Sequence, residues 1–121
     1  NLVTAPTGTP EAVLLRAVEP LAGIDQMRRR RGCARLKDLC SGPAKLVVAF
    51  GISLDHNRAD VTRGDLFVAP AVAPPEEIVV TTRIGLGRGC GEDLMLRYLV
   101  ADSPWVSRPP KADEPAHRER R

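Results

Sequence analysis

The fold class is decided by one stretch, Ile78 to Leu86 (IVVTTRIGL), which carries the best strand pattern in the chain. Most of its side chains are β-branched, and such side chains favour the extended backbone of a sheet. Residues 69–77 before it are rich in proline, which cannot donate to a ladder in a central strand. Further strands are predicted over Glu11 to Glu19, Asp65 to Val68 and Leu94 to Ala101.

Two short helices are predicted between these strands. Residues 24–31 (IDQMRRRR) form the first, with Gly32 as its stop, and residues 44–50 (AKLVVAF) form the second, with Gly51 as its stop. The second helix starts at Ser41-Gly42-Pro43, because serine or glycine caps helices and proline fits the first turn. Loops are predicted over the residues that remain between elements, 33–38, 53–64 and 85–89.

These elements predict a single mixed α+β domain over residues 1–107. The tail, residues 108–121, contains proline and many charges, and we expect it to be disordered. The chain has 121 residues, which suits one small domain, and 43% of them are hydrophobic, which allows a core. The sequence starts at Asn1 without an initiator methionine and reads as a truncated or broken chain.

The charge balance is mildly basic, with a net charge of +3 at pH 7, and 15 of the 18 basic residues are arginine. This balance permits nucleic-acid binding without proving it, although arginine suits bidentate phosphate contacts. No stretch approaches the roughly 20 apolar residues of a membrane span, and no signal peptide is recognisable.

The cysteines are Cys33, Cys40 and Cys90, an odd number without metal-ligand spacing. A disulfide framework in so short a chain would need more cysteine, so we expect a reducing compartment. That compartment is the cytoplasm of a bacterium, near the nucleoid, or the nucleus of a eukaryote.

Several candidate sites in the sequence lack the pattern that a catalytic or cofactor-binding site requires, or have an equally good structural explanation. The glycines of residues 85–91 lack the GxGxxG spacing of a dinucleotide site, and no helix pattern follows them. His56 and His117 lie in a polar loop and in the tail, without a neighbouring nucleophile, so we expect both to be solvent-exposed. The arginine run, Arg28 to Arg31, is either a solvated helix end near the C-terminal dipole or a phosphate-contacting patch.

Arg16 is more informative because it interrupts the apolar run VLLRAV. A guanidinium on the core face of a strand needs a partner. Either Arg16 pairs with an acid such as Glu19, or it points into a polar cleft.

Four motifs then occur in one order along the chain. They are the VLLRA-EP-L segment at Val13 to Leu21, the D-LC-GP-KL segment at Asp38 to Leu46, the R-G-G strand end at Thr82 to Gly87, and the closing LR(F/Y) and SPWVS elements at Leu96 to Tyr98 and Ser103 to Ser107. Together these motifs resemble the 3-methyladenine (alkyladenine) DNA glycosylase family. The resemblance covers residues 11–107 and implies the family's domain, built around a curved, mainly antiparallel sheet. The chain would hold the C-terminal portion of that domain, which is therefore incomplete here.

The implied activity is hydrolysis of the N-glycosidic bond of alkylated or deaminated purines, such as 3-methyladenine and hypoxanthine, in duplex DNA. The family flips the damaged nucleotide into a pocket, and a glutamate acts as the general base for the attacking water. That glutamate and the base-stacking aromatics belong to the family's N-terminal half, so we expect this chain alone to be inactive. The resemblance implies no metal and no cofactor, and we expect a monomer that binds duplex DNA and no membrane.

Few site residues carry over from the family. Arg16 matches the arginine that holds the nucleophilic water and contacts the DNA backbone. Ile84 matches a position whose backbone carbonyl also holds that water. Asn1 fits an asparagine of the base pocket. The DNA-binding set comprises two lysines that match DNA-contacting positions, with two residues at the helix start: Lys37, Lys45, Ser41 and Gly42.

A helix N-terminus beside a lysine is also a reasonable phosphate site on physical grounds alone. The alternative function is a basic DNA-binding or interaction module without catalysis. An isolated piece of a domain with exposed strand edges would have no activity of its own.

Overall fold

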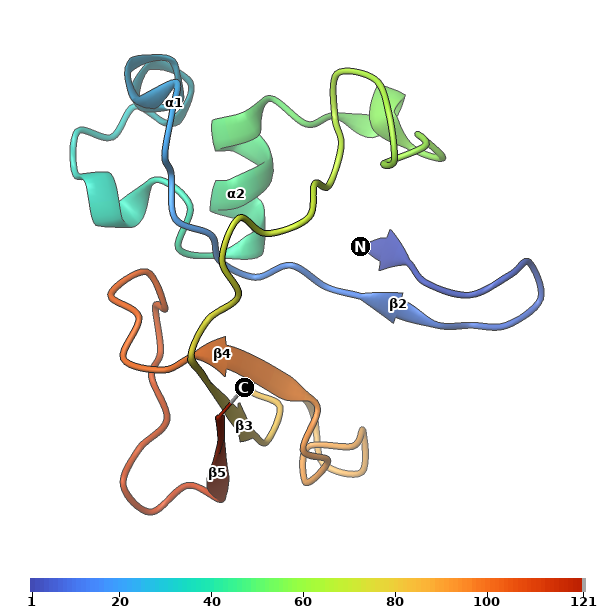
Figure 1. The fold of residues 1–121 in the computed structure, drawn as a ribbon, viewed down its shortest axis with the longest axis vertical. Coiled ribbons are helices and arrows are strands. Elements are labelled where there is room, and N and C mark those ends of the chain that lie inside the picture. Colours follow the sequence, from blue (N-terminus) through green and yellow to red (C-terminus); the bar gives the residue numbers. More distant parts are fainter. Residues whose placement is uncertain (121) are drawn as a thin grey trace. The chain divides into compact units, whose positions relative to one another are not determined.

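The computed structural model describes residues 1–120 and divides into two compact units (Figure 1). Unit 1 comprises Asn1–Ala59 together with Pro104–Ser107, and unit 2 comprises Asp60–Ser103 together with the residues from Arg108 onward. Each unit has its own small antiparallel sheet, and unit 1 also holds both α-helices.

Unit 1 begins with a two-stranded hairpin. Strand β1 (Leu2–Val3) pairs with strand β2 (Ala12–Val13), in the register Leu2↔Val13 and Val3↔Ala12. The predicted strand over 11–19 is therefore wrong beyond Val13. β1 offers a ladder to only two residues of this stretch, and a mostly apolar composition alone cannot sustain a strand without a partner.

The two helices of unit 1 lie where the sequence predicts them. Helix α1 spans Ile24–Arg31 and helix α2 spans Pro43–Phe50. Both end at a glycine in the left-handed region, Gly32 (φ 59°) and Gly51 (φ 71°), which a residue with a side chain rarely adopts. Short 3₁₀ helices, η1 and η2, occupy parts of the predicted loops at Leu36–Asp38 and Leu54–His56.

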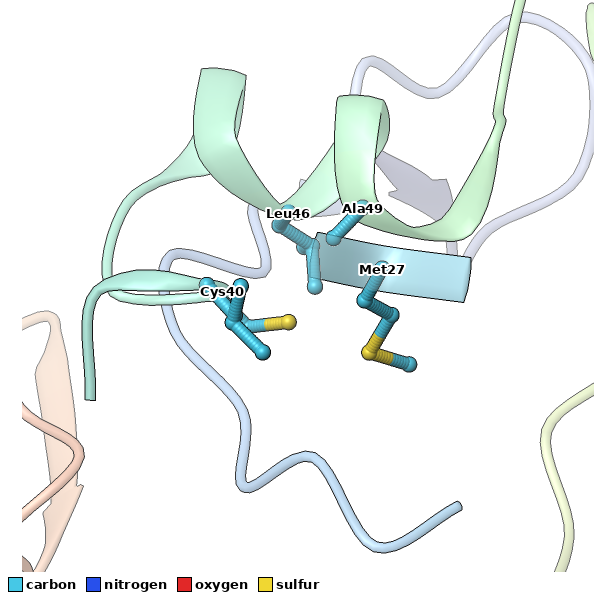
Figure 2. Packing of buried hydrophobic residues seen from close by; sticks show 5 residues of the cluster. Met27, Cys40, Leu46 and Ala49 are labelled. Carbon is cyan, nitrogen blue, oxygen red and sulfur yellow. The ribbon is translucent and has the colours of Figure 1, made fainter. Parts of the chain in front are cut away.

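A small core joins these helices (Figure 2). It is formed by the buried residues Met27, Leu39, Cys40, Leu46 and Ala49. Leu46 and Ala49 are three residues apart, so they share the face of α2 that meets Met27 of α1. Burying each large apolar side chain contributes about 1.5–3 kcal/mol, so this cluster is what fixes the start of α2.

Unit 2 contains a three-stranded antiparallel sheet with the order β4-β3-β5. Strand β3 (Glu77–Thr81) lies in the centre, between β4 (Arg97–Val100) and β5 (Ala116–Arg120). The predicted strands over 78–86 and 94–101 are confirmed in position and are shorter than expected. Val79, Val80 and Thr81 are buried, so the centre of the sheet is also the core of this unit.

Two expectations for unit 2 do not hold. Residues 65–68 form no strand, because the segment turns back on itself and the Val68 amide donates to the Val61 carbonyl (2.8 Å). The tail expected to be disordered contains β5, which pairs with β3 over five residues. Charged composition favours disorder, but here the open edge of β3 supplies a ladder for the tail.

The described residues thus form a mixed α+β fragment with two short helices and two small antiparallel sheets. Within residues 1–120, none of the helices has the length and the apolar character that crossing a membrane requires.

Candidate functional site

The start of α2 brings three of the predicted DNA-binding residues together. Gly42 is the N-cap, and its carbonyl accepts the first helical hydrogen bond, from the Leu46 amide (2.8 Å). Lys45 lies in the first turn, and its Nζ donates to Oγ of the buried Ser41 (3.2 Å). Ser41 therefore holds the lysine ammonium at the positive end of the helix dipole.

The first turn of α2 also has open backbone donors. Pro43 has no amide hydrogen, and no side chain caps the helix at Gly42. The amides of Ala44 and Lys45, at the second and third helical positions, have no acceptor inside a helix. An anion placed there would meet two N–H groups and an ammonium, which is the chemistry of a phosphate site.

Asp38 is the residue of this cluster that sequence reasoning missed. Its Oδ1 lies 3.9 Å from Lys45 Nζ and its Oδ2 lies 3.7 Å from Nη1 of Arg35, while the neighbouring Lys37 is exposed. Asp38 is the first residue of the D-LC-GP-KL motif, and that position was the available signal. We call Asp38, Ser41, Gly42 and Lys45 the α2 entry cluster; Lys37, the fourth predicted DNA-binding residue, lies in η1 and makes no hydrogen bond or ion pair with any of them in the described residues.

Arg16 lies outside this cluster, in the irregular stretch between β2 and α1. The stretch is anchored near it, because the Val18 amide donates to the Cys40 carbonyl (3.4 Å) and Val18 packs on the core of unit 1. Arg16 itself is exposed, and within residues 1–120 neither a hydrogen bond nor an ion pair links it to Glu19. The alternative in which Glu19 neutralises Arg16 therefore has no support in this part of the chain.

Asn1 is exposed and precedes β1. The β1–β2 register, continued by one residue, would set Asn1 opposite Leu14, two residues before Arg16. The hairpin thus gathers Asn1 and the segment leading to Arg16 at one end. Thr4 closes its other end, donating from its amide to the Glu11 carbonyl (3.3 Å) and from Oγ1 to Oε1 of Glu11 (2.6 Å).

Ile84 belongs to unit 2, whereas the other predicted site residues belong to unit 1. It is half-buried and lies three residues beyond the end of β3. The next residue, Gly85, has a φ of 74°, so the chain leaves the strand direction at this point. Ile84 therefore lies in an irregular segment after the strand, next to a bend at Gly85, and not within the strand that the sequence predicted.

The arginine run of α1 does something that neither sequence-based interpretation foresaw. Arg30 Nη1 donates to the Ala49 carbonyl (3.1 Å), Arg31 Nε to the Leu39 carbonyl (3.3 Å), and Arg28 Nε to the Ala34 carbonyl (3.1 Å). These carbonyls lie at the end of α2 and in the connection between the helices. Three of the four guanidinium groups therefore donate to backbone carbonyls, whereas Arg29 makes no such contact within residues 1–120.

The remaining polar groups have local structural roles. His56 Nδ1 lies 3.1 Å from the Ser53 amide, which closes the cap of η2, and His117 pairs with Glu119 (2.9 Å). Burial raises the pKa of the Cys40 thiol, against the opposing charge of Arg31. Across residues 1–120, no three His, Cys, Asp or Glu side chains are grouped as a metal site would require.

Comparison with known proteins supports the family resemblance that the sequence motifs indicate. Residues 1–104 match the model of the methylpurine-DNA glycosylase family. A protein of Rubrobacter xylanophilus, provisionally named a 3-methyladenine DNA glycosylase, is 46% identical over 112 residues, which are 92% of this chain and 56% of the relative. A protein of Methanoculleus marisnigri with the same provisional name is also 46% identical over 112 residues, 89% of this chain and 57% of its own length. The chain spans about half the length of the curated relatives it matches.

Proposed function

The chain belongs to the methylpurine-DNA glycosylase family, and we propose that it works as part of a DNA-repair glycosylase acting on alkylated or deaminated purines in duplex DNA. The observation that carries the proposal is the family match, which runs through residues 1–104 and includes all the predicted site residues. The names of the relatives support 3-methyladenine as one substrate. Hypoxanthine is proposed from the resemblance of the motifs.

The proposed reaction is a hydrolysis. A water oxygen bonds to the anomeric carbon of the flipped nucleotide, the carbon–nitrogen bond to the purine breaks, and the electron pair of that bond leaves with the base. A carboxylate general base takes the proton of the water. The resemblance assigns this carboxylate to a part of the family domain that residues 1–121 do not match, so this chain contributes water and DNA positioning.

Within that reaction, we assign Arg16 to the attacking water and a DNA phosphate. Its exposed guanidinium offers five donors, and neither Glu19 nor another acid competes for them in residues 1–120. We assign the Ile84 carbonyl to the same water as an acceptor, and Asn1 to the base pocket. The α2 entry cluster is assigned to a DNA phosphate, because it combines a helix N-terminus with an ammonium.

The partner is duplex DNA that contains damaged purines, bound by a monomer in the compartment that holds the cell's DNA. Base flipping is part of the proposal because the anomeric carbon is otherwise enclosed by the stacked duplex.

The test is Arg16→Met and Arg16→Lys in an enzyme that has the complete family domain. We expect the single-turnover excision rate to fall by roughly 10- to 1,000-fold in Arg16→Met, the effect of losing one well-placed polar group at a transition state. Arg16→Lys should recover only part of the rate, because lysine keeps the charge and loses the planar fork. The melting temperature should hardly change, because Arg16 is exposed and fastens no backbone in this structure.

Two results would speak against this role. A parallel fall of melting temperature and rate would make Arg16 a structural residue. An unchanged single-turnover rate would remove Arg16 from the reaction. If the unmutated protein with the complete family domain bound duplex DNA without any excision, the alternative of a non-catalytic DNA-binding module would be favoured.

A further inference from the structure

The last part of the chain forms an additional strand outside the family match. That match ends at residue 104, whereas β5 spans Ala116–Arg120. β5 pairs antiparallel with β3, from Thr81↔Ala116 at one end to Glu77↔Arg120 at the other. We call residues 108–120 the C-terminal arm.

The arm is held by its backbone ladder and by polar contacts, not by buried apolar side chains. All five residues of β5 are exposed. Arg118 makes the main side-chain contacts of the arm. Its Nη1 donates to Oε2 of Glu77 (2.7 Å), and its Nη2 donates to Oδ1 of Asp102 (3.2 Å). These two carboxylates hold the pKa of the Arg118 guanidinium above its usual value.

Two further contacts fix the path of the arm where it approaches β3. Thr81, which is fully buried, donates from Oγ1 to the Pro115 carbonyl (2.7 Å). Arg97 of β4 donates from Nη2 to the Arg108 carbonyl. Each of these contacts ends on an arm carbonyl, so it depends on the path of the arm and not on its side chains.

The strand that receives the arm has the opposite character. Val79, Val80 and Thr81 of β3 are buried, and β4 already occupies one edge of β3. Without the arm, the backbone N–H and C=O groups along the other edge of β3 would be unpaired. An apolar strand with an unpaired edge is the usual starting point for strand addition.

We propose that the β3 edge facing away from β4 is a strand-acceptor site, that the arm is its detachable occupant, and that the arm of a second copy of this chain can take the same place. The second copy is the fitting partner because its arm carries the same basic residue for the Glu77 and Asp102 pair, in the same register. Exchange of an identical element between copies costs little, because the contacts made in the dimer are those lost in the monomer. In the intact chain the chain's own arm occupies the β3 edge in preference to the arm of a second copy, because tethering gives it an effective concentration of about millimolar.

The test uses the full chain and a fluorescent peptide of residues 108–121 in place of the second copy. The Arg118→Glu chain should release its own arm and bind the peptide at least about tenfold more tightly than the wild-type chain does. Lys111→Glu makes the same charge change in the arm but outside β5, and within residues 1–120 Lys111 is exposed and takes part in no ion pair, so this variant should bind like wild type. A peptide carrying Arg118→Glu should not bind either chain.

Amide hydrogen exchange provides the second measurement, and it needs no peptide. In Arg118→Glu the β5 amides and the β3 amides facing them should lose protection, whereas the β4 amides should keep it. If Arg118→Glu does not fold, Arg118→Gln removes the charge of the chain's own arm, leaves Glu77 and Asp102 for the peptide, and should strengthen peptide binding about threefold relative to the wild-type chain.

Equal peptide binding by the wild-type and Arg118→Glu chains would overturn the proposal, as would unchanged β5 protection in Arg118→Glu. Neither measurement involves DNA or excision, so its failure leaves the proposed glycosylase function untouched.

Discussion

Lys45 has its charge positioned by two neighbours before any ligand arrives. Ser41 Oγ accepts from its Nζ, and Asp38 lies close enough to attract it without forming a tight pair. Both neighbours are part of the connection that leads into α2, so the ammonium is directed to the first turn of that helix. A phosphate would replace Asp38 as the main counter-ion there.

Lys45→Ala should weaken binding of the complete protein to damaged and undamaged duplex about equally and lower the salt slope of the binding constant by about one unit. The reason is that a phosphate contact releases counter-ions and does not distinguish one base from another. Fluorescence anisotropy over a series of salt concentrations would measure both quantities.

Lys111→Ala is the matched control, because it removes the same charge from an exposed lysine outside the cluster. Asp38→Asn should act in the opposite direction and strengthen binding at low salt. A loss confined to lesion-bearing DNA in Lys45→Ala would contradict the phosphate role.

At the scale of elements, α1 and α2 are joined by guanidinium groups as well as by their core. Arg30 reaches from α1 to the Ala49 carbonyl, one of the last carbonyls of α2, which the helix itself leaves without a partner. The apolar cluster brings the two helices together, and this contact satisfies a group at the end of one of them.

Arg30→Ala should lower the free energy of unfolding by about 1–2 kcal/mol, because it leaves a partly buried carbonyl without its charged donor. Arg29→Ala, one position away in the same helix, should change it by less than about 0.5 kcal/mol, because Arg29 is exposed and fastens no backbone in this structure. Denaturation in urea would compare the two. Equal losses would mean that the run acts through its total charge and not through individual contacts.

The sequence predicted both helices with nearly correct bounds, whereas it placed only two of the strands, β3 and β4, and made both too long, for a physical reason. A helix is closed by its own backbone, so α1 could be bounded by its pattern and by Gly32. A strand exists only where another strand pairs with it, so β2 ends at Val13 although the apolar pattern runs to Val18. For the same reason, part of the charged tail forms β5, because the edge of β3 is available to pair with it.

The candidate site follows the same division. Ser41, Gly42 and Lys45 could be grouped from sequence because they are local to one helix start. The pairing of Asp38 with this lysine depends on the path of η1, and the fastening of the helices by Arg30 depends on the packing of α1 on α2. Neither contact leaves a periodic signal in the sequence.

At the scale of the whole molecule, the residues that we propose as positioning groups are divided between the two units. Arg16, Lys45 and Asn1 belong to unit 1 and Ile84 belongs to unit 2. The relatives are nearly twice as long as their matched part, which leaves room for further catalytic groups in the full-length members.

Residues 1–121 on their own should excise neither hypoxanthine nor 3-methyladenine from duplex DNA. Activation of water needs a carboxylate base, and the motif resemblance assigns none of the acids in this chain to that role. A single-turnover assay against a mock purification would measure it. Turnover above the mock level would make Glu11 and Glu19 the next candidates for the base.

The junction of α2 with α1 also restricts the order in which two positions can change. Gly51 ends α2 with a positive φ, and a Cβ added there would lie 2.9 Å from Cζ of Arg30. Any side chain at position 51 would therefore strain the backbone and also push the guanidinium off the Ala49 carbonyl. Once Arg30 has been lost, only the backbone strain remains. A substitution at position 51 should therefore lower the free energy of unfolding less in an Arg30 variant than in the wild-type chain. A double-mutant cycle would measure this difference as the epistasis between the two sites.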